Sequence, residues 1–387
     1  MINTAEPANI QTILATKFYD FDLGPNRNKG FHAMFGDGIF TADGDAWAHF
    51  RHQLRPQFAR DQVSDLESAG RHLDILFRAL PEENGQGWIE AADLMPFFYR
   101  FTLDVSTEFL FGKSVNTQSR ALYSLDSGNQ TETKADMEFV TALEFGQSYL
   151  AWRYRMGSLF WIFNSKEFQR SCQIVKSFAD SFVNTSLNNV SEKRNEDKFI
   201  FLDELVKETR NPVELRDQVL HLLLAGRDTT SALLSWTTLL LARRPHEFHN
   251  LRKVIIDTFG TAKHPKQDIT FESLKACKPL TNVLFETLRL YPLIPINARR
   301  AVRDTILPVG GGADGRSPMF IKKGEQVGYS AYVLHRRQDL WGEDATSWRP
   351  NRWDGRKLGW EFVGFSGGPR ICLGRKLFSF TSVKQDL

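Results

Sequence analysis

The side chain best suited to chemistry is the Cys372 thiol, which lies in the segment Phe365–Gly374, FSGGPRICLG. A cysteine thiolate binds metal ions, and amide N–H groups pointed at its sulfur tune how strongly it donates electrons. Gly368 and its preceding glycine allow a tight turn that leaves such amides free. A lone cysteine is more often a small buried apolar residue. Within this pattern we interpret Cys372 as a metal ligand, with the Arg370 guanidinium beside it available to an anion.

A second unusual segment is Ala225–Thr230, AGRDTT, inside a strongly helical pattern. Gly226, Asp228 and Thr229 all disfavour the middle of a regular helix. Such a local conflict marks either a functional site or a kink. A bent buried helix without chemistry is the alternative interpretation.

A third pattern places Glu286 and Arg289 three residues apart, on one face of a predicted helix where they can form an ion pair. This spacing alone is weak, because Glu167 and Arg170 repeat it. A further arginine, Arg352, follows in the segment WRPNRW. Two separate surface pairs are one interpretation of these charged side chains, and a single buried cluster of Glu286 with the two arginines is the other.

A fourth pattern is Trp47 with Arg51, four residues apart, which offers an indole N–H and a guanidinium on one helix face. Trp348 and Arg352 have the same spacing, so this pattern is not specific by itself. Its weight comes from the segments around it and from the order of all four motifs.

Together the four motifs resemble the cytochrome P-450 superfamily, whose haem iron is held by a cysteine thiolate. The resemblance implies haem b bound through Cys372. It also implies that cationic and indole groups contact the haem propionates. These are Trp47, Arg51, Arg299 and Arg370. Phe365, Gly368 and Gly374 would complete the haem-binding loop.

The same resemblance assigns roles to the remaining motifs. Gly226 would leave room for dioxygen, Thr229 would donate a hydrogen bond during oxygen activation, and Asp228 would deliver protons. The cluster of Glu286, Arg289 and Arg352 would be structural and hold the segment beneath the haem loop. Asn351 stands where the family usually has an acidic residue, outside the cluster itself.

Segments such as GIFTADGDAW, LRPQFAR and FTLDVSTEFLFG narrow the resemblance to fungal n-alkane and fatty-acid terminal hydroxylases. This implies monooxygenation of an aliphatic chain with dioxygen, and electrons from NADPH through a flavoprotein, NADPH–cytochrome reductase. Apolar side chains would line the substrate pocket. We expect these to be Phe35, Phe40, Leu222, Leu223 and the segment 293–296.

Length and composition fit this interpretation. Among 387 residues, 42% are hydrophobic, and 49 basic against 46 acidic side chains leave a net charge of +3, which argues against a nucleic-acid partner. Three scattered cysteines argue against a disulfide framework. The apolar stretch 219–241 contains Arg227 and Asp228 and is predicted to be a buried helix rather than a membrane span.

Hydrophobic periodicity predicts a mainly α fold with minor β, and the resemblance implies a single cytochrome P-450 domain over residues 1–387 around haem. Helices are expected at Ala46–Phe58, Phe97–Phe111, Phe168–Leu187, Val213–Ala242 and Leu280–Leu290. Strands are expected at Ala298–Val302, Met319–Ile321 and Gln326–Tyr329. The charged segment Asn188–Lys198 is expected to be an exposed loop, and the glycine-rich segment Val309–Pro318 a connection.

The ends of the chain depart from the family pattern. The usual N-terminal membrane anchor and C-terminal strands are expected to be missing, and Phe378 stands where the family has a small residue. The family is expected on the cytosolic face of the endoplasmic reticulum membrane. Two alternatives therefore stay open: a truncated haem-binding remnant without activity, and a haem-thiolate isomerase or dehydratase.

The reductase is expected to dock by charge. Basic side chains flank Arg51 and Cys372, and complementary charge mainly raises the association rate. The residues expected in this basic face are His52, Arg55, Arg60, Arg370, Arg375 and Lys376.

Overall fold

The computed structural model describes residues 2–58, 66–81, 92–123, 134–188, 199–261 and 263–375. Its chain divides into two compact units. The helical unit comprises Leu23–Gln62 and Glu67–Ser231, and the sheet unit comprises Met1–Asp22, Val63–Leu66 and Ala232–Leu387. Of the predicted loop Asn188–Lys198, all residues after Asn188 lie outside the described part.

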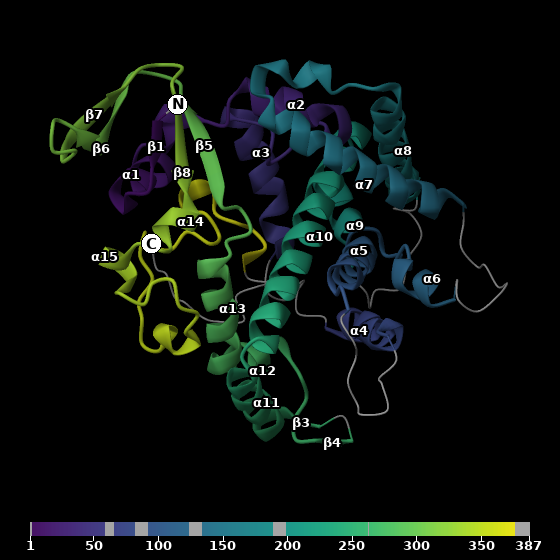
Figure 1. The fold of residues 1–387 in the computed structure, drawn as a ribbon. Helices are drawn as coiled ribbons and strands as arrows, with labels where there is room; N and C mark the ends of the chain where they lie inside the picture. Colours follow the sequence, from purple (N-terminus) through teal and green to yellow (C-terminus); the bar gives the residue numbers. More distant parts are fainter. Residues whose placement is uncertain are drawn as a thin grey trace. The chain divides into compact units, whose positions relative to one another are not determined.

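The described helical unit is built from α-helices, with short 3-10 helices η3 (Pro56–Phe58) and η5 (Gly157–Ile162). Its α-helices are α2 (Pro25–Phe35), α3 (Gly44–Leu54), α4 (Glu67–Ala79), α5 (Met95–Phe111), α6 (Thr117–Tyr123), α7 (Lys134–Arg155), α8 (Lys166–Asn188), α9 (Phe201–Glu208) and the first part of α10 (Pro212–Ala242). Figure 1 shows α10 as the long teal-green helix.

Aromatic side chains fill much of the core of the helical unit. The rings of Phe139 on α7 and Phe178 on α8 stack with centroids 3.8 Å apart. Phe111 at the end of α5 stacks on Phe182 at 4.7 Å. On α8 the buried residues Val175, Ala179 and Val183 recur at four-residue spacing and form one apolar face. These contacts explain part of the high phenylalanine content of the chain.

The sheet unit combines short strands, the end of α10 and further helices. The strands are β1 (Ile2–Thr4), β2 (Phe21–Asp22), β3 (Gly260–Thr261), β4 (His264–Pro265), β5 (Ile296–Ala301), β6 (Thr305–Gly311), β7 (Ser317–Ile321) and β8 (Gln326–Ser330). The helices are α1 (Pro7–Gln11), η1 (Thr12–Thr16), η2 (Phe18–Asp20), α11 (Pro245–Phe259), α12 (Phe271–Ala276), α13 (Lys278–Leu290), α14 (Ala331–Leu334), α15 (Gln338–Trp341), η7 (Pro350–Trp353) and η8 (Gly368–Arg370).

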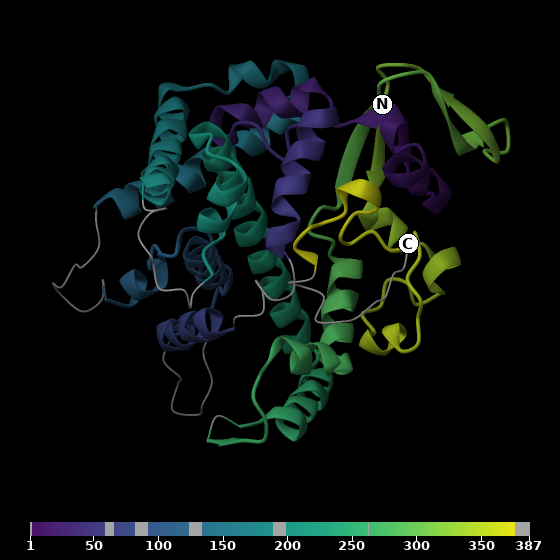
Figure 2. The same cartoon turned by 180° about the vertical axis from the view of Figure 1, so that it is seen from behind.

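The main sheet has the strand order β1-β8-β5-β2, so the first strand of the chain pairs with a strand more than three hundred residues later. β1 is parallel to β8, with Ile2 opposite Val327, whereas β5 runs antiparallel to β8. Apolar side chains from α1, η1 and the sheet, including Ile10, Leu14 and Val327, share one core. Figure 2 shows the segment with η8 beside the N-terminal helices, and η8 contacts η1.

The predicted mainly α fold with minor β is confirmed. The predicted segments 97–111, 168–187, 213–242 and 280–290 all lie within helices, and each predicted strand overlaps β5, β7 or β8. The predicted helix 46–58 ends at Leu54 and continues only as η3, because Pro56 has no amide hydrogen to continue the α-helix. The segment Val309–Pro318 forms the tip of the β6–β7 hairpin.

Several helices lie outside the segments that were predicted by range, including α2, α4 and α7. Among the described residues, no helix combines the length and the apolar character needed to cross a membrane.

Candidate active site

Cys372 lies just beyond η8, on a loop that is held by its own backbone. The Cys372 N–H donates to the Phe365 carbonyl oxygen at 3.0 Å, and Ile371 N–H donates to Gly368 at the same distance. The Phe365 side chain packs against the apolar cluster around Phe285 and Trp353. A backbone hydrogen bond thus closes the loop between Phe365 and Cys372, and the Phe365 ring fixes the loop to the core.

The three cysteines of the chain differ in accessibility. Cys172 and Cys277 are buried, whereas Cys372 is exposed. Burial raises the pKa of the Cys172 thiol to about 11, so this side chain stays protonated and poorly suited to bind a metal. An exposed sulfur on a closed loop is what a haem-thiolate ligand requires. The residues around Cys372 therefore fit the haem b that the sequence predicts.

Gly368 is needed for a reason that the sequence did not reveal. It has a φ of +63°, and a Cβ at this position would lie 1.9 Å from the Leu14 carbonyl oxygen of η1. The close approach of a distant backbone segment, in addition to the left-handed turn, excludes every other residue here. Ser366 also has a left-handed φ of 63°, so the loop holds two residues in this region. Gly374 is the second-last described residue, and the chain after Arg375 lies outside the described part.

Two of the predicted propionate-binding arginines belong to the sheet unit. Arg299 on β5 is buried, and its Nη1 donates to the Ala298 carbonyl at 2.8 Å, with its guanidinium 5.8 Å from the ring centre of Tyr329. The Arg370 guanidinium lies 5.9 Å from the ring centre of Phe18. An aromatic ring lies beside each guanidinium, and a guanidinium is a group that binds anionic carboxylates.

The other two predicted propionate-binding residues belong to the helical unit. Trp47 and Arg51 lie one turn apart on α3, where Trp47 is buried and Arg51 is half-buried. Helical spacing directs both side chains to the same face, as predicted. Asp43 precedes the helix and accepts the Leu23 backbone N–H at 2.9 Å, which fixes the start of the segment.

The predicted oxygen-activating residues lie within α10, which continues through them without interruption. The Thr229 hydroxyl donates to the Ala225 carbonyl at 2.7 Å, and the Ser231 hydroxyl donates to the Asp228 carbonyl at 3.0 Å. A hydroxyl has one proton, so in this state Thr229 can accept a hydrogen bond but must leave Ala225 to donate one. A Cβ on Gly226 would lie 2.9 Å from the Ser106 hydroxyl, which gives this glycine a packing role as well.

The charge of Asp228 is controlled by its neighbours. Burial raises the pKa of this carboxyl, Arg227 lowers it, and Glu144 raises it further. Arg227 is buried and pairs with Glu144 of α7 at 2.9 Å and with Asp228 at 3.4 Å, above the ring of Tyr99. Because its pKa is raised, Asp228 is a better proton donor near neutral pH than an ordinary aspartate. Neither Arg227 nor Glu144 was identified as functional from the sequence.

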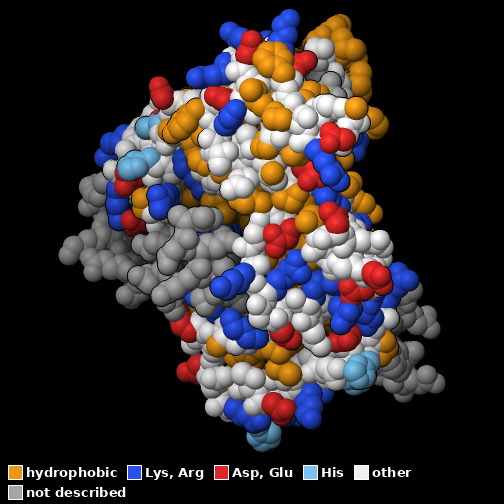
Figure 3. Space-filling view, turned by 90° about the vertical axis from the view of Figure 1, so that its left-hand side faces the viewer, with side chains coloured by type: hydrophobic (Ala, Val, Ile, Leu, Met, Phe, Trp, Pro, Cys, Tyr) orange, Lys and Arg blue, Asp and Glu red, His pale blue; other side chains and the backbone are white. Residues whose placement is uncertain are grey.

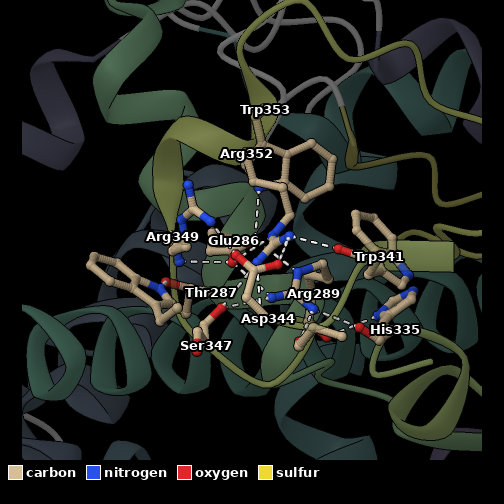
Figure 4. A network of polar contacts seen from close by, with 12 residues as sticks. Glu286, Thr287, Arg289, His335, Trp341, Asp344, Ser347, Arg349, Arg352 and Trp353 are labelled. Carbon is tan, nitrogen blue, oxygen red and sulfur yellow. Dashed lines mark hydrogen bonds and ion pairs between the residues drawn. The ribbon is translucent and has the colours of Figure 1, made fainter. Parts of the chain in front are cut away.

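The predicted structural cluster is drawn in Figure 4, where Glu286 points at both arginines. Arg289 donates to both Glu286 oxygens, from Nε at 2.8 Å and Nη2 at 2.7 Å. Arg352 donates from Nε to Glu286 Oε1 at 3.3 Å. Glu286 and Arg289 are fully buried. The structure brings these three residues together in one ion-pair network, as predicted.

Further groups complete this network and were missed from the sequence. Glu286 also accepts the Arg349 backbone N–H at 2.8 Å and the Trp353 indole N–H at 3.1 Å. Arg352 pairs with Asp344 at 2.9 Å, which lowers the pKa of Asp344 to about 2. The sequence offered two signals for these partners: the Trp353 indole within WRPNRW and the Asp344 carboxylate shortly before that segment.

The residues predicted to line the substrate pocket are found in both units. In the helical unit, Phe40 stacks on His221 of α10 with centroids 5.6 Å apart, and Phe35 meets the same ring edge-on at 6.1 Å. Leu222 and Leu223 follow on α10 and are buried. In the sheet unit, the segment 293–296 contains exposed Ile294 and Ile296. His221, which holds the two phenylalanines, was not singled out from the sequence.

The sequence model of the cytochrome P450 family matches residues 1–378. Cytochrome P450 monooxygenase g430 of a Fusarium species is 50% identical over 97% of this chain and 66% of its own length. Cytochrome P450 52A5 of Candida maltosa is 45% identical over 97% of this chain and 71% of its own length. Cytochrome P450 52A1 of Candida tropicalis is 43% identical over all of this chain and 73% of its own length.

The chain thus spans about two thirds of the length of the first relative and slightly more of the other two. These matches confirm the predicted family, its haem b cofactor and its class of reaction, in which oxygen from dioxygen is incorporated by a monooxygenase. They also confirm the predicted fungal subgroup, and the family implies a redox partner and a hydrophobic substrate. The chain belongs to the cytochrome P450 family.

Proposed function

We propose that this chain hydroxylates an aliphatic substrate, a fatty acid or an n-alkane, with electrons that reach it from NADPH through a flavoprotein NADPH–cytochrome reductase. The observation that carries the proposal is the exposed Cys372 sulfur on a loop closed by the Cys372–Phe365 hydrogen bond. The fungal cytochrome P450 52 relatives support the substrate class.

Cys372 would hold haem b through its sulfur, and the propionates would be bound by Trp47, Arg51, Arg299 and Arg370. When bound, haem b supplies the redox chemistry that places one atom of dioxygen in a C–H bond and releases the other as water. In this proposal residues 1–387 form one cytochrome P450 domain.

Asp228 and Thr229 would manage the protons that this reaction consumes. The Asp228 side chain is itself 35% exposed, so its proton can be replaced from solvent, and its ion pair with Arg227 holds it in place. The Thr229 hydroxyl, one residue further, can accept a proton at Oγ1 and donate its own after it leaves the Ala225 carbonyl. The roles of acid and relay follow from the raised pKa of Asp228 and the bonding of Thr229.

An aliphatic chain would be bound by apolar side chains and shielded from water. Phe35 and Phe40 are fixed against α10 through His221, and Leu222 and Leu223 are buried on the following turn. Ring contacts and burial reduce the freedom of these side chains, which favours a defined orientation of a flexible substrate.

The reductase would dock on a local basic face, and the enzyme would act at the cytosolic side of the endoplasmic reticulum membrane. The surface drawn in Figure 3 mixes basic and acidic side chains. The net charge of the chain is only +3, so docking would depend on particular residues rather than on a broad field. His52 and Arg55 are exposed, and Arg370 and Arg375 are half-buried, while Arg60 and Lys376 lie outside the described residues.

The experiment that tests the proposal has two stages. The purified chain is loaded with haem, reduced, and exposed to carbon monoxide, and the absorption spectrum is recorded. A thiolate ligand gives a strongly red-shifted Soret band. Dodecane and lauric acid are then incubated with the chain, NADPH and a flavoprotein reductase, and hydroxylated products are measured by mass spectrometry.

Each stage has an outcome that contradicts the proposal. Failure to take up haem would favour the inactive remnant. A red-shifted band with turnover of a substrate in the absence of reductase would favour an isomerase or dehydratase. A red-shifted band with reductase-dependent oxidation of an aromatic test substrate but not of either aliphatic compound would overturn the substrate class alone.

A further inference from the structure

His335 follows α14 and is completely buried in the sheet unit. Its Nδ1 lies 3.0 Å from the Arg289 carbonyl oxygen, and its Nε2 lies 2.9 Å from the backbone nitrogen of Val363. A carbonyl oxygen only accepts and an amide only donates. The ring must therefore carry its proton on Nδ1 and none on Nε2. The two contacts together select one tautomer of the neutral imidazole.

The surroundings of His335 preserve this neutral state. Burial lowers its pKa to about 3, and the positive charges of Arg289 and Arg336 act in the same direction. The ring stacks on Phe362 with centroids 5.0 Å apart and meets Trp341 edge-on at 6.3 Å. Aromatic packing thus fixes the plane of the ring, and the two hydrogen bonds fix its rotation.

The first partner of His335 belongs to the buried ion-pair cluster. Arg289 Nη1 donates to the His335 carbonyl oxygen at 2.6 Å, while His335 Nδ1 donates to the Arg289 carbonyl. Arg289 is the second-last residue of α13, where carbonyl groups have no partner within the helix. The reciprocal bonds therefore satisfy the end of α13 and fasten His335 to it.

The second partner opens the segment that carries the cysteine. The Val363 carbonyl accepts the Ser366 N–H at 2.9 Å, and the Phe365 carbonyl accepts the Cys372 N–H at 3.0 Å. A continuous series of hydrogen bonds and short chain segments therefore runs from Arg289 through His335 and Val363 to Cys372. The Val363 N–H donates to the His335 ring, which links this segment to the end of α13.

We propose that His335 is a positioning residue for Cys372, which sets the segment Val363–Cys372 against the end of α13 so that the sulfur is presented in one orientation. This inference rests on the proposed haem-thiolate function. A histidine that only filled space could be replaced by phenylalanine, because the stacking on Phe362 would remain. A positioning histidine could not, because the Val363 N–H and the Arg289 carbonyl would both lose their partner.

Two substitutions separate these roles. His335→Phe keeps an aromatic ring and removes both hydrogen bonds. His335→Gln can place an amide oxygen near the position of Nε2 and thus restore the bond to Val363. His72→Phe is the matched control, since His72 is also buried and its Nε2 lies 2.7 Å from Glu108, in the helical unit.

The measurements are the carbon monoxide spectrum and the rate of haem transfer to apomyoglobin. For His335→Phe we expect most of the red-shifted band to be replaced by the band of a thiol or displaced ligand, and haem loss to be faster by about tenfold or more. His335→Gln should recover most of the red-shifted band. His72→Phe should keep it, even at an equal loss of thermal stability.

Four outcomes decide the matter. A His335→Phe protein with the wild-type band and haem-loss rate would overturn the inference and leave the proposed function standing. Equal loss of the band in His72→Phe would show that any loss of stability removes it, and that His335 has no specific effect on Cys372. If His335→Phe does not fold, a His335→Gln protein that folds but lacks the band would also contradict the inference. Absence of the band in the wild-type chain would instead refute the proposed function, and this inference with it.

Discussion

Two groups of buried charged side chains differ in how completely their polar atoms are bonded. In the sheet unit, Glu286 accepts hydrogen bonds from two arginines, a backbone amide and an indole, and Glu286 and Arg289 are inaccessible to solvent. In the helical unit, the Arg227 Nε and the Gln147 Nε2 are buried without a hydrogen-bond partner in the described part of the chain. Asp228 beside them is 35% exposed.

The difference shows which group can change state. A fully bonded ion-pair cluster loses several interactions at once if one member moves or is neutralised, so it remains rigid. A partly bonded group beside solvent can exchange protons and partners at a smaller cost. The first arrangement suits the support of the Cys372 loop, and the second suits proton delivery by Asp228 and Thr229.

Cys372→Ala should have the largest effect on chemistry and one of the smallest on folding. The side chain is exposed, so the free energy of unfolding of the haem-free chain should change by only about 0.5 kcal/mol. Turnover and the red-shifted carbon monoxide band should both disappear. Urea unfolding measures the effect on stability, and the carbon monoxide spectrum measures the effect on iron ligation. A red-shifted band in the variant would show that another residue holds the iron.

Glu286→Gln should break the fully bonded cluster. Two buried guanidinium groups would lose their shared carboxylate, which costs about 3–5 kcal/mol of unfolding free energy. The matched control is Glu167→Gln, since Glu167 has the same spacing to Arg170 on an exposed surface and should cost at most about 1 kcal/mol. If the two substitutions lower the free energy of unfolding equally, the buried Glu286 cluster is no more important for stability than the exposed Glu167–Arg170 pair.

Thr229→Ala should leave haem binding and folding nearly intact but disturb proton delivery. The hydrogen peroxide released per NADPH consumed should rise several-fold, because oxygen reduction would proceed without an ordered proton relay. Thr230→Ala, on the adjacent position of α10, is the control and should change this ratio little. A ratio that does not respond to Thr229→Ala would argue that the α10 group is structural.

Two buried histidines offer a pH test of both units. Burial lowers the pKa of His335 to about 3 and that of His221 to about 4. Near pH 5 each takes up a proton only when the chain unfolds, so stability falls as the pH drops below about 6.5 and is fully present above it.

His221→Phe should therefore lose less stability between pH 7.5 and 5 than the wild-type chain, by about 2 kcal/mol. Urea unfolding at the two pH values gives this difference. An identical pH dependence in the variant and the wild type would mean that folding does not lower the pKa of His221.

Arg55→Glu should have the smallest effect. Arg55 is exposed just after α3, so its reversal should slow the first electron transfer from the reductase at low salt and have little effect at high salt. Stopped-flow reduction at two ionic strengths measures this. His249→Glu, on exposed α11, provides a comparison outside the predicted basic face. If the rate of the first electron transfer changes with neither the charge reversal nor the salt concentration, Arg55 does not take part in docking.

The sequence alone determined the features that depend on local spacing. Glu286 and Arg289 share a helix face because they are three residues apart, and the conflict between helix and AGRDTT marked the α10 group. The segment FSGGPRICLG identified Cys372 because its glycines allow a tight turn that leaves amide N–H groups free to point at the sulfur.

Only the tertiary structure decided the partners that arrive from distant segments. Asp344 joins the cluster by pairing with Arg352, and Glu144 reaches Arg227 from α7. Gly368 is required by the carbonyl of Leu14, and His335 by Arg289 and Val363. Most of these contacts join segments far apart in the chain, and their approach depends on how whole elements pack. Periodicity along a single segment carries no information about that packing.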